Sequence, residues 1–324
     1  MQSTKEQVLA YLLHHAGTFV TGQALADQLN LSRESIWKAI QALRQAGFQI
    51  QGQAAKGYCY QGTAQLAAPV IEHACRQFKG AITVLTTTPS TQDEAKNYLS
   101  RHTLTMPRVW LAEEQTAGYG RRGRAFYSPA QRGLYFSLAC RLPQPLLHPG
   151  LLTTGIAEAV RTVLQQFYPQ AALSLKWVND VYCNGKKAVG ILTETMMDLE
   201  TQTAQTVVIG CGMNLTGDAF PADLTAKAGA LGPGEKVDRN QLAAALLDAI
   251  IQRVGDYQTG AFLPAYRQHS LVLGKEVELQ GHHETITGAA VAIDEHGALV
   301  VATPTGPRTV VSGEVVKVNI HPNK

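Results

Sequence analysis

The spacing of apolar residues changes twice along this 324-residue chain, and these changes divide it into three segments. The first 60 or so residues have apolar side chains at helical spacing, and the middle of the chain mixes helix and strand patterns. The last 50 residues contain short apolar runs separated by glycine. A chain of this length is expected to form two or three domains. We therefore predict a multidomain α+β protein with domains at 1–63, 70–272 and 273–324.

The first segment is predicted to form three short helices and a hairpin. Thr21 can cap the second helix and Ser32 the third, while Gly47 follows the third helix as a C-terminal glycine. Residues 48–50 and 58–60 alternate like two strands. Short helices joined by a tight turn and followed by a hairpin are typical of a winged helix-turn-helix. Residues 63–72, which contain Ala, Gln and Pro, are predicted to be a linker.

The middle segment is predicted to be a mixed α/β domain. Thr91 and Glu94 can form a capping box at the start of one helix, and Asp238 can cap another that runs to about residue 257. A third helix is expected at 151–167. The strand candidates are 82–85, 109–112, 134–139, 173–177, 189–192 and 207–209.

The third segment has short strand candidates between residues 277 and 318, with glycines at 281, 288, 297, 306 and 313. This spacing predicts a small β-barrel.

Composition excludes several classes of protein. A net charge of +3 is too small to argue for nucleic acid, so DNA binding must come from a local motif. The five cysteines are dispersed, which argues against a disulfide framework and a zinc site. The N-terminus lacks the pattern of a signal peptide, and the apolar runs are too short for a membrane span. We expect a reduced cytoplasmic protein with no membrane partner.

The strongest chemical feature is the run from Gly118 to Arg124, with the sequence GYGRRGR. Glycines let a backbone approach a ligand closely, and arginine forks recognise phosphate. The run lacks the Gly-Lys-Ser/Thr ending of a Walker A loop. A phosphate-binding loop is the functional interpretation, and an exposed basic loop is the alternative.

Lys176 lies near the end of a predicted strand, and Asn179 and Asp180 follow it. A lysine there can neutralise charge that develops on a phosphate, whereas the alternative is a strand followed by an ordinary Asn-Asp turn. The ten histidines are dispersed outside these motifs, which argues against covalent catalysis. Residues 216–237 lack periodicity and are predicted to be a lid over a bound ligand.

Taken together, these motifs resemble the biotin protein ligases, in the class that doubles as biotin operon repressor. Five motifs carry the resemblance, in family order: Ser90-Thr91, Gln115 with the Gly/Arg loop, Lys176-x-x-Asn179-Asp180, Gly190-Ile191-Leu192 and Gly212-Met213-Asn214. The resemblance implies a winged helix-turn-helix, a class II synthetase-like ligase domain and an SH3-like β-barrel.

The resemblance also implies roles for individual residues. Catalysis is assigned to Arg121 and Lys176. The biotin or biotinyl-AMP set is Ser90, Thr91, Gln92, Gln115, Tyr119, Gly120, Arg121, Lys176 and Gly212. The nucleotide set is Arg122, Phe126, Asn179, Lys187 and Asn214. The sequence departs from the family pattern at four positions: Tyr119 replaces an arginine of some members, Gln92 an asparagine, Val178 a proline and Phe126 a tryptophan.

The implied activity uses ATP and biotin as substrates, with Mg²⁺, to form biotinyl-5′-AMP and to biotinylate a lysine of a biotin carboxyl carrier protein. The implied second role is repression through operator DNA, by a homodimer that forms when biotinyl-5′-AMP is bound. The DNA-binding candidates are Gly22, Ser32, Arg33, Glu34, Trp37, Lys38 and Gln41. The sequence assigns no Mg²⁺ ligands. Three alternatives stay open: a lipoate ligase, a repressor that has lost catalysis, and a winged helix used only for protein contacts.

Overall fold

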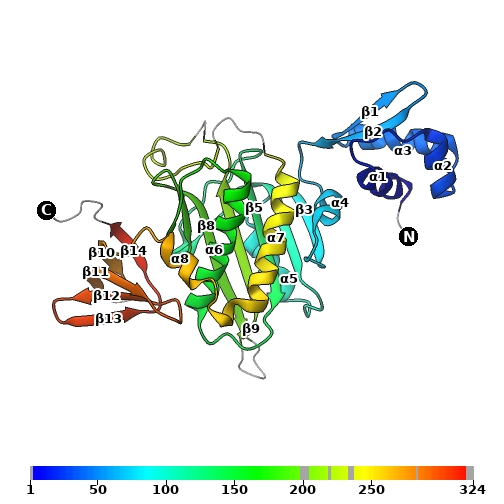
Figure 1. Cartoon of the computed structure of the whole chain (residues 1–324). Coiled ribbons are helices and arrows are strands. Elements are labelled where there is room, and N and C mark those ends of the chain that lie inside the picture. The colour runs from blue at the N-terminus through cyan, green and yellow to red at the C-terminus, as the bar shows by residue number, and fades with distance from the viewer. Residues whose placement is uncertain (1–2, 198–203, 218–219, 233–236, 282–283, 319–324) are drawn as a thin grey trace. The chain divides into compact units, whose positions relative to one another are not determined.

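The computed structural model describes residues 3–197, 204–217, 220–232, 237–281 and 284–318 (Figure 1). The chain divides into two compact units. One comprises Met1–Cys75 with Asp238–Ala244, and the other comprises Arg76–Val237 with Ala245–Lys324.

The first unit begins with three helices that share one apolar core. They are α1 (Thr4–His14), α2 (Gly22–Leu29) and α3 (Arg33–Gln45). Leu12, Leu25 and Ile40 from the three helices are completely buried together. The predicted caps are confirmed, because the Thr21 hydroxyl accepts from the α2 backbone and the Ser32 hydroxyl accepts from the α3 backbone.

The turn between α2 and α3 is short because Asn30 adopts a left-handed conformation (φ 52°, ψ 47°). A hairpin of β1 (Phe48–Gln53) and β2 (Gly57–Thr63) follows α3. The predicted helix-turn-helix and its adjoining hairpin are thus present in the first unit.

The prediction of a linker at 63–72 is wrong in its second half, because α4 (Ala68–Ala74) begins there. Pro69 stands in the first turn of this helix, where its missing N–H costs no hydrogen bond. Val70 and Ile71 are buried, so tertiary packing forms a helix too short to be predicted from its composition. The backbone N–H of Ala67 donates to the side chain of Asn240 at 2.8 Å.

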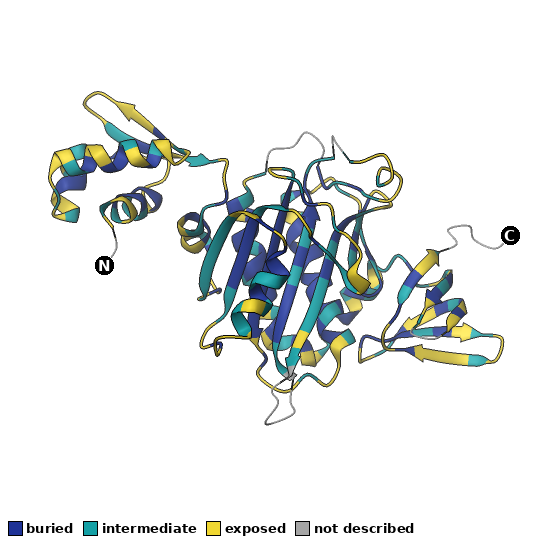
Figure 2. Cartoon of the chain, turned by 180° about the vertical axis from the view of Figure 1, so that it is seen from behind, coloured by how far each residue is buried: buried dark blue, intermediate teal, exposed yellow. Residues whose placement is uncertain are grey.

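The second unit is built on a seven-stranded sheet in the order β3-β4-β5-β9-β8-β7-β6. Its strands are β3 (Ala81–Thr88), β4 (Arg108–Gln115), β5 (Gly133–Arg141), β6 (Leu173–Lys176), β7 (Asp180–Cys183), β8 (Lys186–Met197) and β9 (Ala204–Asn214). Only β3 and β4 pair in parallel. The central strands are mostly buried (Figure 2).

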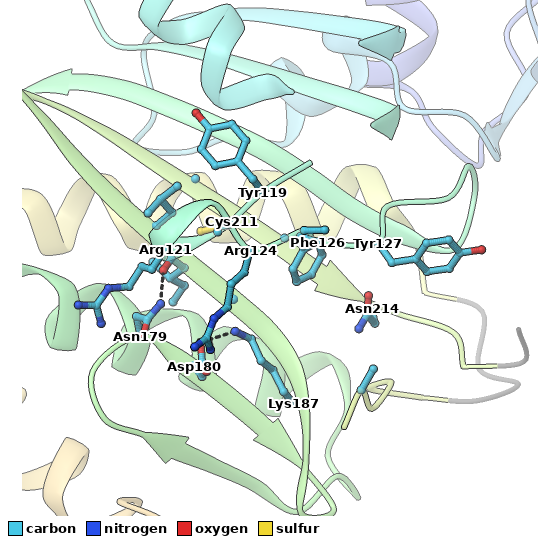
Figure 3. A pocket seen from close by; sticks show the side chains of 18 of the residues that line it. Tyr119, Arg121, Arg124, Phe126, Tyr127, Asn179, Asp180, Lys187, Cys211 and Asn214 are labelled. Atoms are coloured by element: carbon cyan, nitrogen blue, oxygen red, sulfur yellow. Dashed lines mark hydrogen bonds and ion pairs between the residues drawn. The ribbon is translucent and has the colours of Figure 1, made fainter. Parts of the chain in front are cut away.

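The two faces of this sheet differ in composition. Strand register places Leu138, Ile209 and Ile191 on one face. Figures 1 and 3 show helices α6 (Pro149–Phe167) and α7 (Arg239–Asp256) lying across the sheet on the side away from the pocket. The Arg253 guanidinium on α7 pairs with the Glu158 carboxylate on α6 at 3.1 Å. The other face presents small and polar residues, among them Gly190, Gly210, Gly212, Ser137 and Lys176.

Two local predictions in this unit need correction. Asn179 lies in the turn at 177–179 that joins β6 to β7, as predicted, but Asp180 is already the first residue of the short strand β7, where it pairs with Lys176. Thr91 does not cap helix α5 (Thr91–Leu99). Ser90 is the cap, because its hydroxyl accepts from the backbone of Gln92.

The C-terminal part of the second unit follows helix α8 (Leu263–Gln268). It is a five-stranded antiparallel sheet in the order β13-β12-β11-β10-β14. The strands are β10 (Glu276–Gln280), β11 (Thr285–Ile293), β12 (Leu299–Thr303), β13 (Gly306–Val310) and β14 (Glu314–Val318).

The five cysteines are all free and buried. Among the described residues, no helix combines the length and apolar character needed to span a bilayer.

Candidate functional site

A cavity of about 300 Å³ opens on the small and polar face of the seven-stranded sheet (Figure 3). Helix α5, the loop between β4 and β5, the strand floor and β14 all contribute to its wall. Every residue predicted for the ligase site lines it: Ser90, Thr91, Gln92, Gln115, Tyr119, Gly120, Arg121, Arg122, Phe126, Lys176, Asn179, Lys187, Gly212 and Asn214. The structure thus brings together segments that are far apart in the sequence.

Glycines on β9 leave room for the side chains above them. A Cβ at Gly212 would lie 2.7 Å from Cε1 of Phe126, and a Cβ at Gly210 would lie 2.5 Å from Oε1 of Gln92. Such separations are below van der Waals contact. The floor must therefore be glycine for the Phe126 ring and the Gln92 amide to occupy these places.

Hydroxyl and amide groups form one end of the cavity. Gln115 Oε1 accepts from the Thr91 backbone N–H at 2.9 Å and from the Thr91 hydroxyl at 3.1 Å. The Thr91 and Ser137 hydroxyls lie 2.9 Å apart, and Ser137 donates to Gln92 Oε1 at 2.8 Å. Ser90, Thr91, Gln92 and Ser137 are buried. This uncharged, hydrogen-bonding end suits a neutral polar group.

The Gly/Arg loop folds into a small hairpin over the cavity. Tyr119 bridges Ala125, and the Gly120 N–H donates to the Arg124 carbonyl at 2.8 Å. At the turn Arg122 adopts φ +58°, a left-handed conformation that is uncommon outside glycine. The backbone of this loop therefore forms a lip of the cavity.

The three arginines of the loop contact the C-terminal sheet. Arg121 Nη1 donates to the Gly313 carbonyl at 2.9 Å, and Arg122 Nη2 donates to two carbonyls of residues 280–281 at 3.0 Å each. Arg124 forms an ion pair with Glu314. Burial lowers the pKa of Arg121, and the neighbouring charge of Arg122 lowers it further. Three cationic side chains are thus concentrated at one rim of the cavity.

Lys176 and Lys187 add positive charge from the strand floor. Lys176 Nζ donates to the Tyr182 hydroxyl at 3.3 Å, and burial lowers the lysine pKa, which Asp180 and Glu314 partly oppose. Burial, followed by the Asp180 charge, raises the pKa of Tyr182 to about 12. Lys187 pairs with Asp180 at 2.7 Å (Figure 3). These cations suit an anionic ligand such as a polyphosphate.

Two asparagines donate hydrogen bonds to backbone carbonyls in the wall of the cavity. Asn179 Nδ2 donates to the Ile191 carbonyl at 2.6 Å, and Asn214 Nδ2 donates to the Gly229 carbonyl at 3.1 Å. Phe220, Leu224, Lys227 and Ala228 also line the cavity. The predicted lid at 216–237 is therefore part of the wall where it is described, and its positions 218–219 and 233–236 lie outside the described residues.

Sequence reasoning left out several lining residues. They include Arg124, Tyr127, Ser137, Asp180 and Glu314. Arg124 and Asp180 belong to the motifs already noted, so motif membership was an available signal. Glu314 lies 190 positions from Arg124, and no local pattern marks it.

The recognition-helix candidates on α3 form a separate polar surface. Arg33, Glu34, Trp37 and Lys38 are exposed, and the Trp37 side chain is 54% exposed. Lys38 pairs with Glu34 at 2.6 Å. The other three candidates are Gln41, which is partly buried, Gly22, which begins α2, and Ser32, whose hydroxyl caps α3.

Within the described ranges, no cluster of three or more His, Cys, Asp or Glu side chains has the geometry of a metal site. The carboxylates that line the cavity are Asp180 and Glu314. One or two carboxylates together with substrate phosphates are a usual environment for Mg²⁺, so the donor set fits an ion that arrives with a nucleotide.

Comparison with known proteins finds three family models along the chain. The Biotin/lipoate A/B protein ligase family matches residues 84–214, an HTH domain matches residues 4–59, and the Biotin protein ligase C terminal domain matches residues 272–318. Their order agrees with the order of the three predicted segments.

Full-length relatives and a solved structure agree with these matches. The bifunctional ligase/repressor BirA of Bacillus spizizenii is 31% identical over 97% of this chain and 99% of that protein. The protein of the same name from Escherichia coli is 30% identical over 88% of each chain. The structure of the Aquifex aeolicus biotin protein ligase in complex with biotin and ATP covers 73% of this chain and 97% of that one, with 28% identity and a TM-score of 0.63. The chain belongs to the bifunctional ligase/repressor family, whose catalytic part is a member of the Biotin/lipoate A/B protein ligases.

Proposed function

We propose that this chain is an ATP-dependent biotin protein ligase and also a repressor of biotin synthesis genes. It activates biotin to biotinyl-5′-AMP and transfers the biotinyl group to a lysine of a biotin carboxyl carrier protein. Biotinyl-5′-AMP also serves as the corepressor when the chain binds operator DNA.

One observation carries the ligase proposal: a single cavity has a neutral hydrogen-bonding end and a cationic rim. Ser90, Thr91 and Gln115 form the neutral end, and the arginines of the loop form the rim with Lys176 and Lys187. A neutral polar head group fits the hydrogen-bonding end. A carboxylate joined to that head group, with a polyphosphate beside it, fits the cationic rim. Biotin and ATP have this combination, and a cavity of about 300 Å³ is within the usual range for small-molecule sites.

In the first step an oxygen of the biotin carboxylate attacks the α-phosphorus of ATP. A P–O bond to the carboxylate forms, the bond to the β-phosphate oxygen breaks, and pyrophosphate leaves. Arg121 and Lys176 stabilise negative charge on the transferring phosphate, and both line the cavity before the reaction begins. The protein contributes position and charge, and no covalent enzyme intermediate forms.

Mg²⁺ supplies charge neutralisation on the polyphosphate when it is bound. Asp180 is the carboxylate on the cavity floor that would hold it, and Lys187 now occupies that carboxylate at 2.7 Å.

In the second step the amine of the carrier lysine attacks the acyl carbon of biotinyl-5′-AMP. An amide bond forms, the acyl–phosphate bond breaks, AMP leaves and the amine loses its proton to solvent. Water competes with the amine for the same carbon, so the hairpin and the described part of 216–237 must cover the adenylate. Phe126, supported by the glycine floor, provides an aromatic surface for adenine.

Helix α3 is the proposed DNA-reading element. Arg33, Trp37 and Lys38 are exposed along it, and Lys56 lies at the tip of the hairpin that follows. Helix-turn-helix proteins usually bind two half-sites as dimers. We therefore propose a homodimer that forms when biotinyl-5′-AMP is bound.

The finer features of the fold are also proposals. We infer domain boundaries at 1–63, 70–272 and 273–324, a class II synthetase-like arrangement of the central sheet, and an SH3-like barrel for the C-terminal strands. Support for the barrel comes from the register shifts in β10 and β11, which are typical of strongly bent sheets.

Biotin-dependent exchange of labelled pyrophosphate into ATP tests the first step. The second step is tested by transfer of labelled biotin to a carrier domain, with labelled lipoate in a parallel reaction. We expect label from biotin only. Attachment of lipoate alone would overturn the substrate assignment, and absence of both labels would leave a repressor without catalysis.

DNA binding needs its own test. Selection from a random duplex library with the protein, biotin and ATP should enrich a two-fold symmetric sequence, and sedimentation should show a dimer in the same mixture. Enrichment of no sequence would overturn the repressor assignment without affecting the ligase.

A further inference from the structure

Beside the neutral end of the cavity, Lys96 of helix α5 lies at the centre of a cluster of polar side chains. Its ammonium donates to the Tyr119 hydroxyl at 2.6 Å and to Glu194 Oε1 at 3.4 Å, and it lies 3.4 Å from Asp93 Oδ1. An ammonium has three hydrogens, and three acceptors surround it here. Lys96, Asp93 and Glu194 play no part in the chemical steps proposed above.

Tyr119 links this cluster to the Gly/Arg hairpin. Its hydroxyl accepts from Lys96 and donates to Asp93 Oδ1 at 2.7 Å, so both hydrogen-bonding functions of the phenol are used. The residue itself lies in the hairpin, where it bridges Ala125. In Figure 3 its ring points away from Asp180 and Lys187, toward the opposite end of the cavity. The Tyr119 side chain therefore connects the hairpin to helix α5 and takes no part in the chemical steps.

Glu194 links the same cluster to the cavity wall. Its Oε2 accepts from Gln92 Nε2 at 2.8 Å, and that nitrogen also lies 3.4 Å from the Val208 carbonyl. Gln92 Oε1 accepts from Ser137. Glu194 thus fixes which way the Gln92 amide faces, and the amide in turn orients the Ser137 hydroxyl, which lies 2.9 Å from the Thr91 hydroxyl.

The hydrogen-bonded chain continues to the far side of the hairpin. Thr91 donates to Gln115, Gln115 Nε2 donates to Ser128 Oγ at 3.0 Å, and Ser128 donates to the Phe126 carbonyl at 3.0 Å. The outgoing strand of the hairpin is thus held at Tyr119 and the returning strand at Phe126. Both attachments lead to helix α5.

We propose that Lys96, Tyr119, Asp93 and Glu194 form a latch that holds the Gly/Arg hairpin closed over the biotin end of the cavity. Lys96 and Glu194 are positioning residues: they act through Tyr119 and Gln92 and do not touch the reacting atoms. The latch sets how long biotin and its adenylate stay bound. This inference rests on the proposed function for the identity of the ligand, but not for the contacts that close the hairpin.

The electrostatics favour a latch that stays charged. Burial lowers the pKa of Lys96, but the hydrogen bond with Tyr119 and the charge of Glu194 raise it more, so the net pKa lies above the ordinary lysine value. Burial raises the pKa of Tyr119, and its hydrogen bond to Asp93 opposes loss of the proton. Lys96 therefore stays an ammonium and Tyr119 a neutral phenol at neutral pH.

The first test replaces Tyr119 by Phe, which removes both hydrogen bonds and keeps the ring. We expect the KM for biotin in pyrophosphate exchange to rise about 5- to 10-fold, as loss of one to two partly buried hydrogen bonds predicts. The KM for ATP should change by less than about twofold. Hydrolysis of biotinyl-5′-AMP to free biotin should accelerate in the absence of carrier. Tyr98→Phe is the matched control, because it removes a tyrosine hydroxyl from helix α5, near Lys96 in the sequence but outside the latch.

The second test uses Lys96→Gln, Glu194→Gln and the double variant. Lys96→Gln leaves the Glu194 carboxylate without its cation, and Glu194→Gln leaves Lys96 with Asp93 as its remaining carboxylate, so each should raise the biotin KM. The double variant forms a neutral amide pair and should recover at least half of the combined loss. A purely structural role would lower Tm and raise both KM values together, without recovery. That pattern, or an unchanged biotin KM in Tyr119→Phe, overturns the latch.

Hydrogen exchange in the ligand-free protein separates this inference from the proposed function. Amides of residues 116–128 should exchange faster in Tyr119→Phe and in Lys96→Gln than in the wild type and in Tyr98→Phe. This comparison needs no biotin, so it would stand if the wild type activated a different acid. Identical exchange in all four proteins overturns the latch even if the wild type is a biotin ligase.

Discussion

The Arg124 guanidinium forms an ion pair with the Glu314 carboxylate, and this contact joins the Gly/Arg hairpin to the last strand of the described chain. Arg121 and Arg122 make parallel contacts with carbonyls of the same C-terminal sheet. All three arginines at the rim of the cavity are therefore oriented by a part of the chain that contributes little of the cavity floor.

Glu314→Lys tests the importance of this contact for the nucleotide end. The substitution replaces an attractive contact with a repulsive one, and the pair is partly exposed, so we expect a loss of about 1 kcal/mol. The KM for ATP should rise about fivefold and the biotin KM should change less. The combination with Arg124→Glu restores opposite charges. If it fails to recover any of the ATP affinity, the two residues do not act as a pair.

Lys176→Ala and Arg121→Ala should each lower kcat/KM for pyrophosphate exchange about 10²- to 10³-fold. This is the usual effect of removing one preorganised group that stabilises developing charge. Lys79→Ala is a suitable control, because Lys79 is an exposed lysine outside the cavity. Near-normal exchange in both site variants would contradict the placement of the reaction.

The pH dependence of kcat/KM should show an alkaline limb below the ordinary lysine pKa of 10.5. Burial lowers the Lys176 pKa, so this side chain loses its proton, and with it the charge that the reaction needs, at a lower pH than a free lysine. Activity should be present below that pKa and fall as the pH rises through it. Lys176→Arg retains its charge and should move the limb to higher pH. If the alkaline limb stays at the same pH in Lys176→Arg, it reports the titration of another group.

Gly212→Ala should impair nucleotide binding without unfolding the protein. The new methyl group would lie 2.7 Å from the Phe126 ring, so the ring must leave the floor. We expect the KM for ATP to rise about tenfold, which corresponds to loss of most of one aromatic stacking contact. Gly255→Ala, which places a methyl in open space on α7, should leave both KM values unchanged. An equal effect of the two alanines would exclude this steric explanation.

Arg33→Ala and Lys38→Ala should weaken DNA binding and leave biotin transfer intact. Lys38 is free to contact a phosphate, because its exposed pair with Glu34 contributes little energy. Loss of one phosphate contact reduces the slope of log K against log salt by about 1. The slope should be measured on the selected duplex by fluorescence anisotropy. Unchanged slopes in both variants would move the DNA surface away from α3.

The sequence was a good guide wherever the information is local. Thr21, Ser32 and Asp238 cap helices as their positions predicted, because a cap depends on the next three residues alone. It failed for α4, whose seven residues are helical because Val70 and Ile71 are buried. It also assigned the cap of α5 to Thr91. The Thr91 hydroxyl instead donates to Gln115 Oε1 and lies 2.9 Å from the Ser137 hydroxyl.

The residues of the candidate site also fall into two groups: those that a local motif marks and those that only the folded chain brings to the site. The motifs supplied the lining of the cavity, because each lies at the end of a strand or within a strand that forms the cavity floor. Glu314 and Lys96 could not be found in this way, because their partners Arg124 and Glu194 are 190 and 98 positions distant and only the folded chain brings them together.

The glycines on the ligand face of the central sheet have a consequence for how this protein tolerates change. Gly190, Gly210 and Gly212 give no side chain to the core, so the cohesion of these strands depends on their other face, where Ile191, Ile209 and Cys211 are buried. One face of the sheet therefore serves the stability of the core, and the other face leaves space for the ligand. Stabilising substitutions should be sought on the helix-covered face, whereas added side chains on the glycine face should weaken substrate binding before they affect the core.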